Sequence, residues 1–373
     1  MRFHRSALAL PLLALAACGG AGPETVGSIA PPAPSGGTSG GGSGVGTPGT
    51  GTGSTSPGNL LAVSTATNFT AVGALHSFSY SETGSLYEGN ASTVKAPSGT
   101  ISYDPRDGVF TVALTDDKAG FAQNTRFQDP AHRADYNPEA TPNLEAPNLA
   151  GFNYLEAGTA TETTSFFYQR PGEGTYVTLA GFTRNVRDDN GVTKRQHGVL
   201  AFGTPTIQTQ IPVSGTGTYT GGFLASAVLN NGPQGDSYMQ WLTGTSAVSV
   251  DFARSTVDLR INGAVGPTFQ NGQRVADAAL ANPTGTAFQA VGSATIDMLR
   301  YNGFSGAFTG ATLGGKAIDF TSAANGTGTA GASSIDGTFF GPNAVNVGGN
   351  FRIVGGVPGQ RVDIQGAFTG AKK

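Results

Sequence analysis

Hydrophobic and polar residues alternate with a period of two along most of the chain beyond residue 59, in short runs separated by turn residues. The clearest runs are 248–252, 257–261 and 345–353. This period places apolar side chains on one face of a strand and polar side chains on the other, as in an antiparallel sheet over one core. Most runs are roughly five to eight residues long, as is usual for strands. Only 274–282 has a weak helical pattern, and Pro283 limits it.

The region 212–373 contains about eight or nine such runs, which are enough strands to close a small barrel. The segment Gly306–Ala311 recurs with the same residues as Gly366–Ala371, so we expect two equivalent strands of one barrel. Glycine recurs on the apolar side of the runs, as expected where strands curve tightly. We therefore predict an eight-stranded antiparallel β-barrel with a packed core.

The region 59–211 is also rich in strand patterns, although they are less regular. Turn residues predict hairpins at 104–108, 170–174 and 188–191. The acidic turn 188–191 would also suit calcium, but the twelve-residue loop and terminal Glu of a calcium-binding loop are missing. The predicted fold class is all-β, with a first β domain followed by the barrel.

The N-terminus predicts export and a lipid anchor. Residues 1–17 have two arginines, a short apolar stretch and small residues, which together form a signal peptide too short to span a bilayer. The small residues lead directly into Cys18, the only cysteine, in a pattern that resembles a bacterial lipobox. We expect Cys18 to be acylated and to hold the protein in the outer membrane. The alternative is an ordinary signal peptide with an accidental cysteine.

Residues 18–58 predict a disordered tether. They are rich in Gly, Ser and Pro, and Glu24 is their single charged residue. They show no apolar periodicity, so they cannot bury a core. Such a tether would lift a folded body off a membrane surface.

Charge and composition exclude several classes of function. The chain has 21 Lys and Arg against 24 Asp and Glu, a net charge of −3, whereas a nucleic-acid-binding protein usually has a basic excess. A single cysteine cannot form an intramolecular disulfide or supply a cysteine-based zinc site. We find no convergent set of acid, base and nucleophile, and therefore expect neither an enzyme nor a metal site.

Ligand-binding candidates are concentrated in a long polar segment, 119–152, that contains four prolines. Long loops in compact domains often bind ligands. The candidates in this segment are Arg126, Phe127, His132, Arg133 and Tyr136. Among the histidines of the mature chain, His132 is preferred as a ligand contact because of this loop, whereas His76 and His197 are read as solvated or structural. We predict no cofactor, and haem is the alternative, because any of the three histidines could in principle ligate its iron.

Two aromatic residues, Tyr238 and Trp241, follow a polar turn at 230–237. Exposed aromatic side chains at loop ends often anchor interfaces. Both are therefore candidate ligand contacts, and the alternative for Trp241 is packing within the barrel.

Residues Gly337–Ala344, continuing into Val347–Phe351, resemble the last strands of the barrel domain of transferrin-binding protein B. Residues Gly215–Gly221 resemble the opening strand of that domain, and Ser249–Phe252 resemble its second strand. One departure is Asn346, where the family often has Glu.

The resemblance implies an N-terminal β handle over 59–211, a barrel over 212–373, and binding through loops. The length allows one handle and one barrel, as in single-lobe surface lipoproteins related to the family. The implied ligand is an iron or haem carrier, the implied export route is an outer-membrane translocator, and a transporter is a further possible partner. The alternative is a structural or adhesive envelope lipoprotein that captures no solute.

Overall fold

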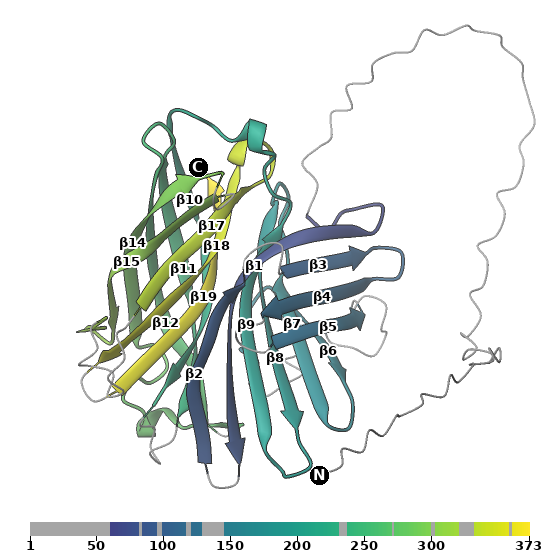
Figure 1. Cartoon of the computed structure of the whole chain (residues 1–373), viewed down its shortest axis with the longest axis vertical. Coiled ribbons are helices and arrows are strands. Elements are labelled where there is room, and N and C mark those ends of the chain that lie inside the picture. Colours follow the sequence, from purple (N-terminus) through teal and green to yellow (C-terminus); the bar gives the residue numbers. More distant parts are fainter. Residues whose placement is uncertain are drawn as a thin grey trace, which may run out of the picture. The chain divides into compact units, whose positions relative to one another are not determined.

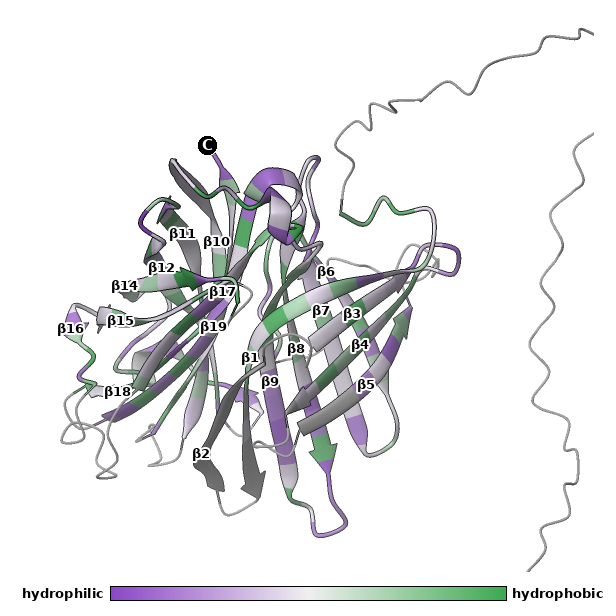
Figure 2. Cartoon of the chain, turned by 45° about the horizontal axis from the view of Figure 1, so that its top comes forward, coloured by the Kyte–Doolittle hydropathy of each residue, from purple (hydrophilic) through white to green (hydrophobic). Residues whose placement is uncertain are grey.

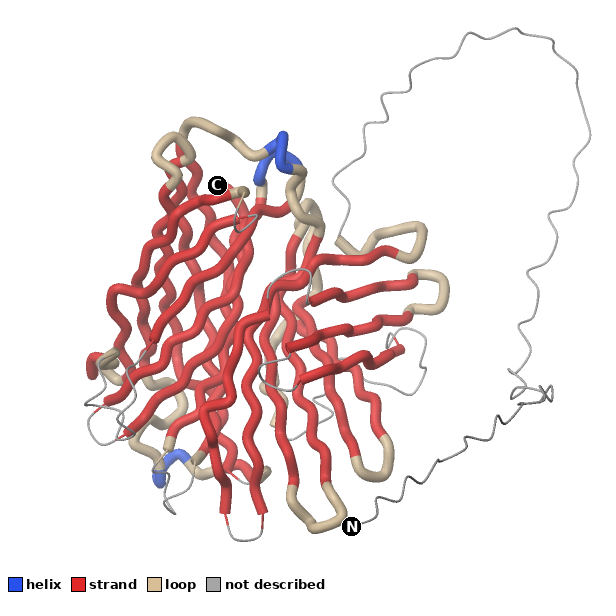
Figure 3. Tube along the Cα trace, viewed as in Figure 1, coloured by secondary structure: helices blue, strands red, loops and turns tan. Residues whose placement is uncertain are grey.

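The computed structural model describes residues 60–81, 84–94, 99–116, 121–128, 145–230, 237–270, 272–299, 303–320, 332–357 and 360–373. The predicted all-β fold is confirmed. In these residues helix occurs only as three 3₁₀ turns, and strands make up most of the chain (Figure 3). The turns are η2 (Gln208–Gln210), η3 (Asp277–Ala279) and η4 (Pro342–Ala344). The predicted signal peptide, Cys18 and the tether lie outside the described residues.

The first nine strands form an antiparallel sheet, which we call the handle (Figure 1). Its order is β5-β4-β3-β1-β9-β8-β7-β6, and β2 pairs with the second half of β1. The strands β5 and β6, at the two ends of this order, also contact each other, so the sheet curls around its own core. The strands are β1 (Thr67–Ser81), β2 (Gly84–Val94), β3 (Gly99–Asp104), β4 (Val109–Asp116), β5 (Phe121–Gln128), β6 (Phe152–Gly158), β7 (Glu162–Gln169), β8 (Val177–Arg187) and β9 (Thr193–Gly203).

The remaining strands form a second antiparallel sheet, which closes into a barrel (Figure 1). The order β11-β10-β19-β18-β17-β15-β14-β12 is closed by pairing of β12 with β11, which confirms the predicted eight-stranded barrel. The strands are β10 (Thr216–Leu229), β11 (Tyr238–Asp251), β12 (Thr256–Gln270), β14 (Ala287–Asp297), β15 (Gly303–Leu313), β17 (Ala332–Phe340), β18 (Asn346–Val357) and β19 (Gln360–Lys372), with the two-residue strands β13 (Gln273–Arg274) and β16 (Lys316–Ala317) at its margin.

Each sheet encloses a hydrophobic core. Hydrophobic and hydrophilic residues follow each other along single strands (Figure 2), so one face of each strand is apolar. In the barrel, Val257, Leu259 and Ile261 are buried inside, whereas Asp258 and Arg260 between them are exposed. The repeated GAFTGA segments lie in β15 and β19, and the phenylalanine of each belongs to the barrel core, as predicted.

The strands extend further than the alternation predicts. Seven of the eight long barrel strands have between 11 and 15 residues, because Gly, Ser and Thr continue the pairing where the hydrophobic signal stops. The segment 119–152 is not a loop throughout, since 121–128 forms β5 and pairs with β4. The weak helical pattern at 274–282 yields only η3. The three predicted hairpin turns are confirmed, and at 188–191 the Asp188 carboxylate accepts from two backbone N–H groups of the turn.

Candidate functional site

One face of the handle is covered by the barrel. Strands β7, β8 and β9 are apolar on both faces: Phe166, Phe182 and Leu200 point into the handle core, while Phe167 and Val199 belong to a separate cluster shared with the barrel. A sheet that is buried on both faces has continuous apolar runs instead of alternation. The other members of this shared cluster are Val72, Ala146, Phe152, Tyr154, Val177, Leu179 and Ala201 from the handle, with Leu224, Val228, Met239, Trp241, Phe269, Phe340 and Ala367 from the barrel.

Trp241 is the largest side chain in this shared cluster. It is fully buried and points outward from β11 toward the handle. Its ring meets Phe167 edge-on at a centroid distance of 5.7 Å. Its indole N–H donates to the carbonyl oxygen of Glu145 (2.7 Å), so the polar atom of the ring is satisfied although it is buried. Trp241 therefore joins the barrel both to the handle and to the segment that precedes β6.

A small polar group completes the handle–barrel contact. Arg195 and His197 continue the barrel-facing row of β9, and both are buried. Arg195 forms an ion pair with the buried Glu145 carboxylate, and His197 Nε2 lies 3.7 Å from the same carboxylate. Burial disfavours the charged imidazole, and the nearby Arg195 adds repulsion, so the pKa of His197 falls to about 3. His197 is therefore neutral at ordinary pH.

The linker between the two sheets is hydrogen-bonded to both. The Thr204 N–H donates to the Tyr176 carbonyl of the handle (3.0 Å). The Thr206 hydroxyl donates to the Gly341 carbonyl of the barrel (2.7 Å). Gly341 has a φ of +71°, and a Cβ there would come within 2.5 Å of the Tyr176 ring. Only glycine meets both conditions, which gives this residue of the family-like motif a role in seating the handle.

Asn346 also bonds to both parts of the molecule. Its side-chain oxygen accepts from the Tyr176 N–H (3.1 Å), and its side-chain nitrogen donates to the Gly370 carbonyl (3.3 Å). A carboxylate at this position could accept but not donate. The Asn346 amide therefore accepts from the handle and donates within the barrel, and a carboxylate could make only the first of these two hydrogen bonds.

A cleft of about 160 Å³ lies where the β7–β8 turn meets the barrel. Arg170 is the one charged side chain among its lining residues, and the others are polar or small. The lining residues are Gln169, Arg170, Pro171, Gly172, Thr175, Val177, Thr178, Thr220, Gly221, Gly222, Asn346, Thr369, Gly370 and Ala371.

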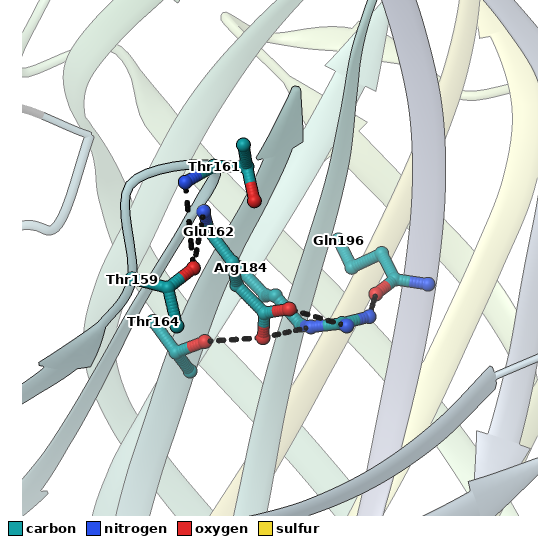
Figure 4. A network of polar contacts seen from close by, with 6 residues as sticks. All are labelled: Thr159, Thr161, Glu162, Thr164, Arg184 and Gln196. Atoms are coloured by element: carbon teal, nitrogen blue, oxygen red, sulfur yellow. Dashed lines mark hydrogen bonds and ion pairs between the residues drawn. The ribbon is translucent and has the colours of Figure 1, made fainter. Parts of the chain in front are cut away.

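A network of polar side chains lies on the strands of the handle around Arg184 (Figure 4). Arg184 donates to both carboxylate oxygens of Glu162 (2.7 and 2.9 Å) and to the side-chain oxygen of Gln196 (2.7 Å). The Thr164 hydroxyl donates to the same carboxylate (3.3 Å). These side chains lie on the face that carries Phe166: Thr164 and Arg184 form the next same-face pair beyond Phe166 and Phe182, and Gln196 pairs with Arg184. The Arg184 guanidinium holds the pKa of Glu162 below its usual value.

We expect Glu162→Gln to lower the free energy of unfolding at pH 7 by about 1 kcal/mol, because a charge-assisted bidentate contact is lost at a partly exposed site. The pKa of Glu162 is lowered in the folded state, so its contribution is present above the ordinary carboxyl pKa and is lost as the pH falls through the folded value. Urea unfolding should therefore separate wild type and variant at pH 7 and show them converging in acid. Glu173→Gln, at an exposed turn, is the control and should change little. An equal loss at both positions would contradict the role given to Glu162.

The structure does not bring the sequence-predicted contact residues together. Arg126 is exposed on β5, whereas Phe127 is buried in the handle core, 5.6 Å from Phe166. Tyr238 is buried in the barrel core, and its hydroxyl accepts from Gln360. Burial raises the pKa of Tyr238. Trp241, on the opposite face of β11, is covered by the handle, as described above.

The predicted contacts His132, Arg133 and Tyr136 lie outside the described residues. Within the ranges that the structure describes, no group of three or more His, Cys, Asp or Glu side chains is placed to hold a metal ion. In the same ranges no helix is both long and apolar enough to cross a membrane.

Sequence reasoning missed the handle–barrel interface and the cleft. A signal for the interface was present, since 177–182 and 198–202 are apolar without alternation, which is typical of strands covered on both faces. Arg195 and His197 lie on the same face of β9 as the apolar residues Val199 and Ala201. These two polar residues were the signal for a polar group in the covered face. Arg170 was assigned only to a hairpin turn, and no local signal indicated that β10 and β19 lie beside it.

No family model matches this chain, and no curated protein matches it. Similar solved structures include intact Ap-TbpB with its N and C lobes, at 13% identity, covering 85% of this chain and 78% of that one with a TM-score of 0.33. A double mutant of the vaccine antigen Transferrin Binding Protein B from Haemophilus parasuis Hp5 has 14% identity, the same two coverages and a TM-score of 0.33. A single mutant of that antigen has 13% identity, coverages of 86% and 79%, and a TM-score of 0.27. These structures belong to the family that the sequence motifs resemble.

Proposed function

We propose that this chain is an outer-membrane lipoprotein, tethered at the cell surface, that binds a protein ligand through its handle and barrel. The observation that carries the proposal is the handle–barrel interface: an apolar cluster, a buried ion pair and the linker bonds join two β domains into one body. A rigid scaffold that carries its loops at fixed positions suits ligand capture. The lipobox-like Cys18 and the tether support a position away from the membrane surface.

The ligand class that we propose is an iron or haem carrier, on the basis of the family resemblance. We assign ligand contact to Arg126 and to His132, Arg133 and Tyr136 of the segment that follows it. We assign Phe127, Tyr238 and Trp241 a supporting role, because their side chains are buried. An outer-membrane translocator for export and a transporter for the captured solute are the proposed partners.

We expect protease treatment of intact cells to remove the protein while a periplasmic control protein survives. The measurement is an immunoblot of treated and untreated cells. Cys18→Ser removes the acylated atom, and this variant should leave the membrane fraction. Protection of the wild-type protein until the outer membrane is broken would contradict the surface position.

Retention of haemoglobin, haem or an iron-binding protein by the purified chain would identify the ligand. A surface protein that retains none of these would instead fit the alternative, a structural or adhesive envelope lipoprotein.

A further inference from the structure

The barrel wall has a break in its hydrogen-bond ladder between β10 and β19. The ladder pairs Thr220 with Ala371 and resumes at Phe223 with Phe368, but it passes over the two intervening pairs. The omitted pairs are Gly221–Gly370 and Gly222–Thr369. On their other sides these four residues are paired normally. Gly221 and Gly222 pair with β11, and Thr369 and Gly370 pair with β18. The break is therefore local to one seam of the barrel.

The hydroxyl of Ser246 lies at the break. It lies on β11 inside the barrel and donates to the Thr369 carbonyl (2.6 Å), with the Gly222 carbonyl also within 3.2 Å. The Lys373 N–H donates to the Thr218 carbonyl, so Thr218 and Lys373 are a hydrogen-bonded pair of this ladder. Such pairs recur at every second residue of an antiparallel ladder, and a regular ladder would therefore bond the Gly222 N–H to the Thr369 carbonyl. Both intervening pairs are missing from the ladder, so the Gly222 N–H does not bond to the Thr369 carbonyl, which accepts from Ser246.

This break forms the floor of the cleft described above. All four residues of the omitted pairs line it. A Cβ built on Gly222 would find only ordinary contacts, 3.5 Å from the Gly244 carbonyl oxygen and 3.6 Å from Leu179 Cδ1. The missing side chain therefore leaves space on the handle side of the floor.

The chemistry of the cleft is rich in hydrogen-bond donors. Gly222, whose N–H is left out of the ladder, lies in its floor, and the lining residues include Thr175, Thr220 and Thr369, which carry hydroxyl donors. Arg170 is the charged side chain of its lining, and no acidic side chain is among the lining residues. Donors around a single guanidinium favour an anion with more than one acceptor oxygen.

We propose that this cleft binds a carboxylate group, held by the Gly222 N–H and the Arg170 guanidinium. The cleft of about 160 Å³ has room for a carboxylate with a short carbon chain. Either a free small acid or an acidic side chain of a protein supplies this chemistry. The proposal does not depend on the cell-surface position or on an iron carrier, and its test uses purified protein alone.

The test is a titration followed by amide NMR of the purified mature chain. The probes are glutarate, the blocked tripeptide acetyl-Gly-Glu-Gly-amide, and the same peptide with Gln in place of Glu. We expect glutarate or the Glu peptide to shift the Gly222 amide resonance, which is identified by its loss in Gly222→Val. Binding of glutarate alone assigns the site to a small acid, and binding of the Glu peptide alone assigns it to a protein side chain.

Variants separate the cleft from nonspecific effects. Gly222→Val fills the space, and in this variant the probes should no longer shift the amide resonances of the other lining residues, such as Gly221 and Gly370. Gly310→Val, a strand glycine with room for a Cβ on β15, should leave the probe-induced shifts unchanged. Arg170→Gln should weaken binding at least fivefold, whereas Arg187→Gln, the loss of an exposed arginine at the far end of β8, should leave it unchanged. The proposal is overturned if neither carboxylate probe shifts the Gly222 resonance, or if the Gln peptide binds as well as the Glu peptide.

Discussion

Replacing Trp241 by Ala is expected to lower the free energy of unfolding by about 3–5 kcal/mol, as for other fully buried aromatic side chains. The indole fills the contact between barrel and handle, meets Phe167 edge-on and donates to the Glu145 carbonyl. Removing it leaves a cavity between two sheets that cannot collapse without moving one of them. The measurement is urea unfolding at pH 7, followed by far-ultraviolet circular dichroism because the variant lacks the single tryptophan.

Two further variants test where this stability comes from. Trp241→Phe keeps an aromatic ring but loses the N–H, and it should cost about 1–2 kcal/mol. Val291→Ala, on a partly exposed part of the barrel wall, should change the free energy by less than about 0.5 kcal/mol. If the contact makes handle and barrel one cooperative unit, wild type unfolds in one transition. A loss below about 1 kcal/mol in Trp241→Ala would show that the interface contributes little.

Acid should destabilise the protein through His197. The pKa of His197 is about 3 in the folded protein, against an ordinary value of 6.5, because the ring is buried and Arg195 lies near it. Between these values the unfolded chain binds a proton that the folded chain does not, so stability falls as the pH drops from 6.5 toward 3. The full loss is up to roughly 5 kcal/mol. Urea unfolding at pH 7, 6, 5 and 4 measures it.

The comparison that isolates this effect is His197→Gln, which keeps a polar side chain without a titration in this range. The groups that face His197 are Arg195 on its own strand, the Glu145 carboxylate, the Trp241 ring and Thr183, its ladder partner on β8. The register also pairs His197 with His76 on β1. Other groups titrate equally in both proteins, so the wild type should lose more stability on acidification than the variant does. Parallel pH profiles would exclude His197 as the cause.

The barrel could be predicted from the sequence because its signal is local. In β12 every second residue from Val257 to Ile261 is apolar and buried, while the residues between are polar and exposed. A period of two needs no knowledge of the partner strands. Closure followed from the number of runs, and the turns at 104–108 and 170–174 followed from their residue types. These parts of the fold depend on neighbours within a few residues.

Strand ends and the handle edge could not be predicted in the same way. Gly and Thr residues extend β10 at 216–218, ahead of the apolar alternation that begins at Tyr219, because they are held by pairing with β11. Arg126 and Phe127 occur in a polar, proline-containing segment, yet β4 pairs with this part and buries Phe127. Pairing between strands decides such cases, and it is a property of the folded chain.

The sequence by itself determined an all-β chain with a closed barrel, its turns and its apolar strand faces, because these follow from local periodicity and turn chemistry. Only the tertiary structure decided which outer faces are covered. It placed Trp241 against the handle, joined Glu145 to Arg195 across about 50 residues of chain, and set Arg170 beside the broken ladder of β10 and β19. These contacts depend on the docking of one sheet on another, which no local pattern encodes.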